Sequence, residues 1–367
     1  MKGVCLVAAD APGGIRRYVR TLAEGLAARH PERPVVVLDS RGRWAWSSPL
    51  VCLFVGLRLI GLAAVGRVAT IHLMASERMS LWRKGALAGL ASSLGLNVIV
   101  HHHGARLPER ARHGGRMERL ALRLVARMAH RHLVLGEAWR DALVAAGAAP
   151  ERIEVLPNAL PDRPAPERPL VVGAPLKLLF LGEISRRKGV FTVLETLEDL
   201  TRRGVPFEAL LVGDGPDRQA VLHRLEAREP GALRIAAPGR ASEGATEGLM
   251  GWADMLLHPS THEGLPMALL EALRSGLPSL ASPVGAIAEW MPDGDGVEYV
   301  PPEDATALTE AVLRHAADPA RRRALGLAAR HAFEARFTLQ RHLDRMIALY
   351  DWERPDENAF ATARHAA

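Results

Sequence analysis

Two glutamates, Glu263 and Glu271, stand eight residues apart on either side of an expected helix start. The apolar run Met255–Leu257 before them is typical of a buried parallel strand, and Pro266 followed by an apolar run is typical of a helix with proline in its first turn. Glu263 is therefore expected on the loop and Glu271 on the helix. In an open parallel sheet, ligands bind beyond the carboxyl ends of the strands.

The backbone amides around Gly264–Met267 at this helix start form a natural phosphate seat. Phosphates and two carboxylates cannot share that seat. The simplest ligand places its phosphates on the amides and its neutral hydroxyls on the carboxylates, which describes a nucleotide-activated sugar. Two glutamates alone would favour an ordinary solvated helix face. The residues around them must therefore distinguish a ligand site from such a face.

The motif Pro259–Pro266 together with Glu271 resembles the E-x7-E signature of retaining glycosyltransferases of family 4, which have the GT-B fold. The resemblance implies that Glu263 binds hydroxyls of the transferred sugar and Glu271 accepts the ribose hydroxyls. It also implies retention of anomeric configuration, with the leaving phosphate assisting deprotonation of the acceptor. The amides implied to hold the diphosphate are those around Gly264, Leu265 and Pro266.

A basic turn, Arg186–Gly189, follows the expected strand Leu178–Leu181. Cations there could stabilise the charge that builds on a departing diphosphate, although a solvated basic turn is the plainer interpretation. The family's Lys-Gly pair matches at Lys188, which the resemblance places on the diphosphate. Many members have arginine where this chain has Glu183, so either Arg187 or Arg186 supplies a second cation, or the donor is handled differently.

A glycine turn at Gly13 and Gly14 opens a helix after the first expected strand. A tight structural turn and a close backbone approach to a ligand explain these residues equally well. The resemblance to the family's Gly-Gly loop, which lies near the diphosphate and the acceptor, favours the second.

Three consecutive histidines, His101–His103, end the expected strand at Val98–Val100. Neighbours on a strand point to alternate faces and cannot readily converge on one metal ion. The family's His-Gly pair matches His103-Gly104 and implies that His103 lies near the transferred sugar, while His101 is expected to be buried or structural.

The turn at Gly213 follows the next strand, and Arg218 stands where the third glycine of a dinucleotide fingerprint would be. An oxidoreductase therefore loses its main support, whereas the family's Gly-x-Gly-Pro turn matches and implies a role in the nucleotide pocket. The run Asp293–Gly296 predicts a turn rather than a metal-binding Asp-x-Asp. Neither a metal nor a cofactor is expected.

The chain has 367 residues, of which 48% are hydrophobic and 24% are charged, so two large globular domains are expected. We predict an N-terminal acceptor domain over 1–162, a proline-rich linker over 163–176 and a donor domain over 177–340. A crossing helix and loose tail over 341–367 are implied by the resemblance. Alternating strands and helices predict α/β architecture in each half: two Rossmann-like domains that would face a cleft, as in GT-B.

The expected strands of the first half are Val4–Ala8, Val35–Leu38, Val68–Leu73, Val98–Val100, His132–Leu135 and Ile153–Leu156. Those of the second are Leu178–Leu181, Glu208–Val212, Leu233–Ala237, Met255–His258, Ser279–Ala281 and Val297–Val300.

Two cysteines imply no disulfide framework and suit a reducing compartment. The N-terminus lacks a signal-peptide pattern, which favours a cytoplasmic protein that is not exported. The apolar stretch Leu50–Val65 is shorter than the roughly 20 residues that a spanning helix needs, and it carries Arg58. A buried helix is therefore predicted.

Residues 1–162 carry 23 Lys+Arg against 12 Asp+Glu. An expected basic amphipathic helix concentrates this charge at Arg116, Arg119, Arg123 and Arg127. A solvated face is the default, nucleic acid lacks a recognition motif, and contact with the anionic inner face of the cell membrane would bring an enzyme to a lipid-linked acceptor.

Taken with the resemblance, these features predict transfer of a hexose from a UDP- or GDP-sugar to a glycan or lipid-linked acceptor, as in cell-surface polysaccharide biosynthesis. The alternatives are a catalytically silent sugar-nucleotide binding module and, with less support, the dinucleotide-dependent oxidoreductase.

Overall fold

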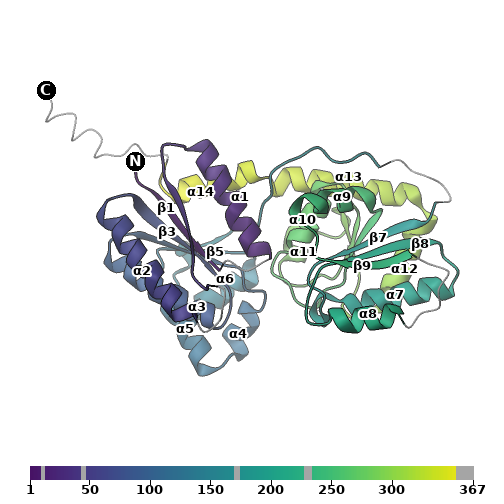
Figure 1. Cartoon of the computed structure of the whole chain (residues 1–367), viewed down its shortest axis with the longest axis horizontal. Coiled ribbons are helices and arrows are strands. Elements are labelled where there is room, and N and C mark those ends of the chain that lie inside the picture. The colour runs from purple at the N-terminus through teal and green to yellow at the C-terminus, as the bar shows by residue number, and fades with distance from the viewer. Residues whose placement is uncertain (10–12, 43–46, 169–173, 227–233, 353–367) are drawn as a thin grey trace. The chain divides into compact units, whose positions relative to one another are not determined.

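The computed structural model describes residues 1–9, 13–42, 47–168, 174–226 and 234–352. The chain divides into two compact units (Figure 1). The first comprises Met1–Pro161 and the segment from Leu339, and the second comprises Asp162–Thr338. The expected tail from Arg354, residues 169–173 of the expected linker and Leu233 lie outside the described residues, while residues 161–168 contain neither helix nor strand.

The first unit is built on a parallel sheet with the order β2-β1-β3-β4-β5-β6 among the described residues. Its central strands are apolar and buried on both faces, as parallel strands covered by helices must be. The strands are β1 (Gly3–Ala8), β2 (Val35–Asp39), β3 (Val68–Ala75), β4 (Asn97–His102), β5 (Arg131–Val134) and β6 (Ile153–Val155).

Helices connect these strands and cover the sheet. Right-handed crossovers place α1, which leads from β1 out to β2, on one face, and α2, α3 and α5, which lead back across, on the other. The elements are α1 (Gly14–Arg29), α2 (Ser48–Ala64), α3 (Met79–Ser93), α4 (Leu107–His113), α5 (Arg116–Met128), α6 (Glu137–Ala145) and the 3-10 turn η2 (Pro150–Arg152).

The C-terminal helix α14 (Leu339–Leu349) belongs to the first unit, as the expected crossing helix should. It lies against α1 (Figure 1), and Leu343 and Met346 pack into a core with Leu6 and Leu22. The segment from Leu339 therefore completes the hydrophobic core of a unit whose other strands and helices lie more than 170 residues earlier in the chain.

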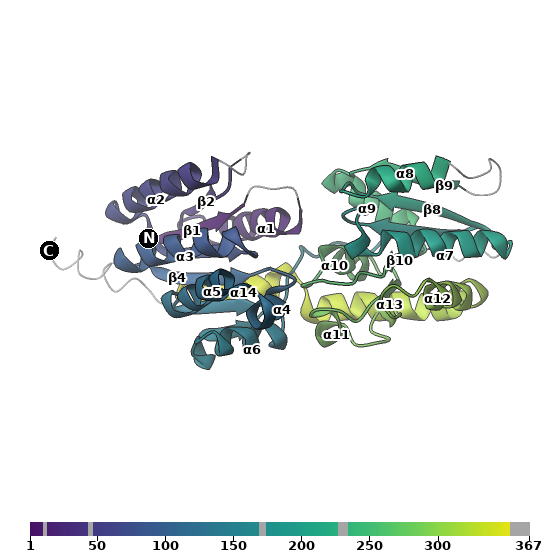
Figure 2. The ribbon, with the colours of Figure 1, turned by 90° about the horizontal axis from the view of Figure 1, so that it is seen from below.

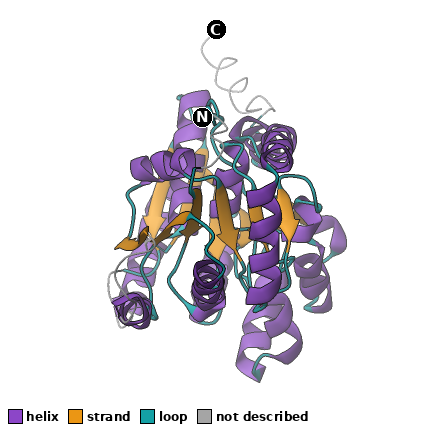
Figure 3. Cartoon of the chain, turned by 90° about the vertical axis from the view of Figure 1, so that its right-hand side faces the viewer, coloured by secondary structure: helices purple, strands orange, loops and turns teal. Residues whose placement is uncertain are grey.

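The second unit repeats the architecture, in which helices flank the strands of a sheet (Figure 3). Among the described residues its strand order is β12-β11-β10-β7-β8-β9. All neighbouring strands are parallel. The strands are β7 (Leu176–Leu181), β8 (Phe207–Val212), β9 (Arg234–Gly239), β10 (Met255–His258), β11 (Ser279–Ala281) and β12 (Val297–Tyr299).

The core of the second unit joins strand residues such as Leu178 and Leu257 to helix residues such as Leu194 and Leu308. The connecting elements are the 3-10 turn η3 (Arg186–Lys188), α7 (Val190–Arg202), α8 (Arg218–Glu226), α9 (Glu243–Trp252), α10 (Met267–Arg274), α11 (Ile287–Trp290), α12 (Ala305–Ala317) and α13 (Pro319–Arg336).

The prediction that Leu50–Val65 forms a buried helix is wrong in one respect. The helix exists as α2, and Val55, Leu59 and Leu62 are buried. Its other face is exposed, however, with about 60% or more of Leu53, Phe54 and Leu57 open to solvent. Because both faces of α2 are apolar, the residue pattern could not show that only one of them is covered.

Candidate functional site

The site predicted in the second unit lies at the carboxyl ends of β10, β7 and β8, which are neighbours in the sheet. From β7 the chain builds β8 and β9 on one side of that strand. It then crosses back and builds β10 on the other side of β7. This reversal of strand order is where open α/β sheets bind ligands. The loops that leave these three strands carry Glu263, Lys188 and Gly213, so residues far apart in sequence lie at one sheet edge.

Glu263 and Lys188 form an ion pair at this edge. Lys188 Nζ donates to Glu263 Oε1 over 2.6 Å, and only 5% of the Glu263 side chain and 15% of the Lys188 side chain are exposed. Two more groups meet the same oxygen: His258 Nε2 at 2.8 Å, and the Ser260 hydroxyl, which donates over 2.7 Å. Glu263 is therefore held in one position by groups on two loops.

The carboxyl group of Glu263 stays ionised. Burial by itself raises its pKa, but the positive charge of Lys188 and the hydrogen bond from His258 outweigh burial and hold the pKa well below the usual range. Burial lowers the pKa of His258, although its hydrogen bond with Glu263 opposes that shift. Among the described residues, the hydrogen bonds to the Glu263 carboxylate all fall on Oε1 rather than Oε2.

The turn after β7 also fixes the backbone of the glutamate loop. Both the backbone N–H and the hydroxyl of Thr261 donate to the carbonyl of Arg187, and Arg187 Nη1 donates to the carbonyl of His262. Gly189 has φ +77°, and a Cβ added there would lie 2.1 Å from the Pro259 carbonyl oxygen. Only glycine allows both that backbone conformation and that approach, so the glycine of the Lys-Gly pair is required by the packing of the two loops.

Glu183, where the sequence departs from the family pattern, interacts with one of the two arginines considered as the second cation. Arg187 Nη2 lies 3.5 Å from Glu183 Oε1, so this guanidinium is shared between Glu183 and the His262 carbonyl. The Arg186 guanidinium instead lies 4.9 Å from the centre of the Phe191 ring. Of the two, Arg187 is the arginine tied to the loop that carries Glu263.

Gly213 closes the turn after β8 against the turn after β7. Its φ is +152°, and an added Cβ would lie 1.7 Å from the Gly182 carbonyl oxygen. The Gly213 N–H donates to the Gly239 carbonyl, and the Ile184 N–H donates to the Asp214 carbonyl. The Gly-x-Gly turn therefore allows the backbones of three neighbouring strand ends to meet, a packing role that is separate from any contact with a nucleotide.

Glu271 lies on α10, eight residues after Glu263, and is the fifth residue of that helix. Its residue surface is only 2% exposed, and α10 begins at Met267 after Pro266. The Gly264 carbonyl accepts from the Ala286 N–H, while 4% of Leu265 is exposed. The expected positions of Glu263 on the loop and Glu271 on the helix are thus confirmed. The segment before α10 is hydrogen-bonded to the loop after β11.

The predicted residues of the first unit lie at the carboxyl edge of its own sheet. His103 directly follows β4, and its backbone N–H donates to the Ala75 carbonyl. Gly104 is constrained because an added Cβ would lie 2.8 Å from Cγ of Glu77, and its carbonyl accepts from Trp139 Nε1. The imidazole of His103 has a buried Nε2 that lacks a partner among the described residues.

The three consecutive histidines alternate as a strand requires. The rings of His101 and His103 are 4.0 Å apart on one side, whereas His102 Nε2 lies 3.2 Å from His132 Nδ1 on the other. His101 is fully buried, as expected. Within the described parts of the chain, no group of three His, Cys, Asp or Glu side chains is arranged to hold a metal ion.

Acid should destabilise the first unit through this cluster. Burial lowers the pKa of His103 to about 3 and that of His101 well below its ordinary value, and neighbouring histidines add to both shifts. The unfolded chain then binds more protons below pH 6.5, so stability is lost as the pH falls from there toward the folded-state pKa. At pH 5 each such histidine costs about 2 kcal/mol.

Urea unfolding at pH 7.5 and pH 5.0 measures this loss. His101→Phe should make the difference between the two pH values about 2 kcal/mol smaller, because it removes one proton-binding group. His223→Phe, at an exposed position on α8, is the matched control and should leave the difference unchanged. An equal pH dependence in His101→Phe and the unsubstituted chain would contradict the assignment.

Gly13 precedes α1 as its N-cap residue, and Gly14 is the first residue of the helix. Both are exposed, and an added Cβ at Gly13 would meet no atom within 4 Å. Among the described residues, the space next to Gly13 is therefore open, which leaves room for the close backbone approach expected from the sequence. Pro12, quoted with this motif, lies outside the described residues.

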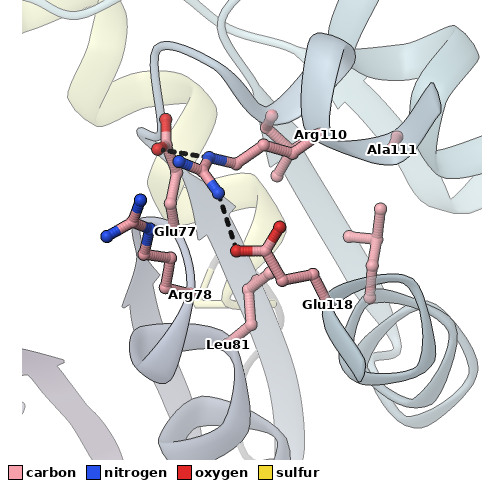
Figure 4. A pocket seen from close by; sticks show the side chains of 8 residues that line it. Glu77, Arg78, Leu81, Arg110, Ala111 and Glu118 are labelled. Atoms are coloured by element: carbon pink, nitrogen blue, oxygen red, sulfur yellow. Dashed lines mark hydrogen bonds and ion pairs between the residues drawn. The ribbon is translucent and has the colours of Figure 1, made fainter. Parts of the chain in front are cut away.

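Cavities also occur among the described residues of both units. In the first unit, Arg110 pairs with Glu77 at 2.9 Å and with Glu118 at 2.6 Å around a cavity of about 10 Å³ (Figure 4), which is roughly the space of one water molecule. A larger cavity of about 260 Å³ in the second unit is lined by Asp254 and Pro278, which directly precede β10 and β11. It therefore lies at the opposite edge of the sheet from Glu263.

The sequence did not single out the residues that position Glu263. Ser260 was part of the quoted motif and His258 ended the expected strand before it, but neither had an assigned role, and the structure places both on the Glu263 carboxylate. Their spacings of five and three residues before Glu263 were the available signal.

A buried lysine of the first unit, Lys84, was also not singled out from the sequence. It is 1% exposed, donates to the Ser40 hydroxyl, and burial lowers its pKa to about 7.

Comparisons with known proteins agree with this geometry. The family model described as glycosyl transferases group 1 matches residues 175–318, and the model described as glycosyl transferase 4-like domain matches residues 13–159. The two matches fall on the second and first units respectively.

Curated relatives match over part of their length. The putative colanic acid biosynthesis glycosyltransferase WcaL of Salmonella typhimurium is 27% identical over 48% of this chain and 45% of its own. The alpha-D-kanosaminyltransferase of Streptomyces kanamyceticus is 28% identical over 50% and 46%. The chain thus spans about half the length of the curated relatives it matches.

Solved structures match over nearly the whole chain. Sucrose-phosphate synthase from Thermosynechococcus elongatus has a TM-score of 0.76 at 19% identity, covering 96% of this chain and 99% of its own. Anabaena HepE in complex with UDP-glucose has a TM-score of 0.73 at 18% identity, covering 96% and 100%. These likenesses establish the two Rossmann-like α/β units.

Proposed function

The chain belongs to the group 1 glycosyltransferases, and from this membership we propose that it transfers a hexose from a nucleoside-diphosphate sugar to a glycan or lipid-linked acceptor. The observation that carries the proposal is the buried Lys188–Glu263 pair beside the start of α10. It offers a fixed carboxylate for sugar hydroxyls and a cation for a departing phosphate within one site.

The Lys188–Glu263 ion pair has a clear use in this reaction. Lys188 and Arg187 would stabilise the negative charge that develops on the leaving diphosphate, which is where electrostatic help lowers the barrier most. Glu263 would accept hydroxyls of the transferred sugar through Oε2 while Oε1 remains held by His258 and Ser260. A carboxylate fixed in advance loses little freedom when the sugar binds.

The nucleotide would be held by the adjoining elements. Glu271 would accept the ribose hydroxyls, the backbone around Gly264, Leu265 and Pro266 would hold the diphosphate, and the turn at Gly213 would shape the pocket. The first unit would contribute His103 and the backbone of Gly13 and Gly14. Because burial keeps His103 neutral, it would act there as a hydrogen-bonding group rather than as a cation.

We further propose retention of anomeric configuration without a metal ion. Both follow from the family resemblance, and the leaving phosphate would receive the proton of the acceptor hydroxyl as the new glycosidic bond forms. Proton NMR of the first product formed in EDTA tests them together. Donor and product of the same anomeric configuration are expected; inversion, or a strict need for added Mg²⁺, would contradict the respective claim.

Polysaccharide assembly is the proposed setting. Relatives include WcaL, named for colanic acid biosynthesis, and AmsK of Erwinia amylovora, named for amylovoran biosynthesis. In the described part of the chain, the structure holds no helix with the length and apolar character to cross a membrane. We propose peripheral contact with the inner face of the cell membrane through the basic N-terminal unit, where Arg116, Arg123 and Arg127 of α5 are exposed.

Replacing Glu271 with alanine should mainly weaken donor binding, because the ribose hydroxyls would lose their acceptor. Calorimetric titration with the productive nucleoside diphosphate should show about a tenfold or larger rise in Kd, the loss expected for a hydrogen bond to a charged group. Glu310→Ala, at an exposed position on α12, is the control. Unchanged donor affinity in a folded Glu271→Ala protein would contradict the ribose assignment.

A further inference from the structure

Helix α2 is apolar on two faces, of which the unit covers one. Val55, Leu59 and Leu62 point into the first unit. Five large side chains form the apolar stripe on the other face, with 41% to 67% of each exposed: Leu50, Leu53, Phe54, Leu57 and Ile60. Their spacing of three, four, seven and ten residues from Leu50 places them along one side of the helix.

The apolar stripe is unusual within this molecule. No other described helix carries more than two exposed large apolar side chains. Isolated exposed apolar residues are ordinary, but a contiguous apolar patch marks a surface that meets an apolar partner. We therefore expect an apolar partner to cover the apolar stripe.

The charge around the stripe identifies the kind of partner. No Asp or Glu occurs between Ser40 and Ser76, while Arg58 on α2 and Arg41 and Arg67 beyond its two ends are exposed. Helix α3 lies between α2 and the arginine-rich α5 in the same layer (Figure 2). An apolar strip bordered by arginines complements a bilayer surface, where acyl chains lie beneath anionic headgroups.

Other occupants fit less well. A second copy seated on the same patch would bring Arg58 and its neighbours against the same arginines, with no acidic residue in that segment to neutralise them. A span is excluded by geometry: α2 has 17 residues and is about 25 Å long, shorter than the hydrocarbon core, and its inner face is packed on the unit.

We propose that α2 is the element that docks this protein on an anionic lipid surface, with the apolar stripe at the headgroup boundary and the flanking arginines on the headgroups. This inference rests on the proposed peripheral membrane contact and names the element that makes it. The helix would lie in the plane of the interface.

Flotation of the full chain with vesicles tests the proposal. The vesicles are phosphatidylcholine alone, or phosphatidylcholine with phosphatidylglycerol. The double variant Leu53→Gln/Leu57→Gln removes two stripe side chains without changing charge, and Val144→Gln, at another exposed apolar position of the first unit, is the matched control. The unsubstituted chain and the control should float with the anionic vesicles, and the double variant should bind at least about tenfold more weakly.

Three outcomes would overturn the proposal. The first is a failure of the unsubstituted chain to bind anionic vesicles at all, and the second is a double variant that binds as well as the control. The third is a dimer, seen by sedimentation without vesicles, that the double variant abolishes, which would identify a second copy as the occupant. Donor hydrolysis without vesicles should be equal in the variant and the control, so a failed vesicle result leaves the transferase proposal standing.

Discussion

Glu263→Gln should lower the rate of sugar transfer by about 100-fold or more, the usual cost of deleting one preorganised electrostatic group. The substitution keeps the shape of the side chain but removes the charge on which Lys188, His258 and Ser260 converge. An amide also presents an N–H where the sugar hydroxyls need an acceptor. Steady-state release of nucleoside diphosphate measures the effect, and kcat should fall more than donor affinity.

Glu298→Gln is the matched control for this substitution. Glu298 is also a mostly buried glutamate of the second unit held by cations, with contacts to Arg314 at 2.6 Å and to Arg321 at 2.9 Å. Glu298 lies on β12, which β11 separates from β10 in the sheet, so it is away from the loops after β7 and β10. Its variant should transfer sugar normally. A near-normal rate in Glu263→Gln would remove this carboxylate from the site.

Lys188→Ala is expected to lower transfer by a similar factor, about 100-fold or more, because the departing diphosphate would lose its nearest cation. The structural cost is part of the effect: a buried carboxylate left without its ion-pair partner is strongly destabilising. The melting temperature must therefore be measured beside kcat. Lys188→Arg, which restores the charge, should recover stability more than it recovers rate.

Lys177 gives a control within the same unit. It lies near the start of β7, whereas Lys188 lies on the turn after the end of that strand. The Lys177 ammonium group lies 5.9 Å from the centre of the Trp252 ring and takes no part in the site. Lys177→Ala should keep the rate of transfer, whereas equal losses in Lys177→Ala and Lys188→Ala would show that the effect of Lys188 is on folding alone.

The losses from Glu263→Gln and Lys188→Ala should not add, because the two groups are in direct contact. Residues in one ion-pair network show interaction energies of about 0.5–3 kcal/mol in double-mutant cycles. Additive losses would mean that the two side chains act independently in the reaction, contrary to the arrangement around Glu263 Oε1.

The local parts of this site could be predicted from the sequence. Alternating apolar runs placed Glu263 on a loop and Glu271 on a helix, because strand and helix periodicities are properties of short segments. The two-residue period also separated His102 from His101 and His103 correctly. The position of α14 in the first unit came from the family resemblance and is confirmed.

The contacts between distant segments could not be predicted in the same way. Lys188 and Glu263 are 75 residues apart, and their pairing depends on β10 lying beside β7. Residue patterns indicate strands but do not fix the strand order. The same limit applies to α2, where two apolar faces predict burial equally and only the packed structure shows which face is covered.

Donor hydrolysis is the most direct test of the central claim that the second unit holds a nucleotide sugar with Glu263 and Lys188. The unsubstituted chain and Glu263→Gln would be incubated in EDTA with a panel of UDP- and GDP-hexoses, starting with UDP-glucose because HepE binds it. We predict selective release of one nucleoside diphosphate, reduced about 100-fold or more in Glu263→Gln. Binding without release would indicate a silent sugar-nucleotide module, and a failure of every donor to bind would contradict the account.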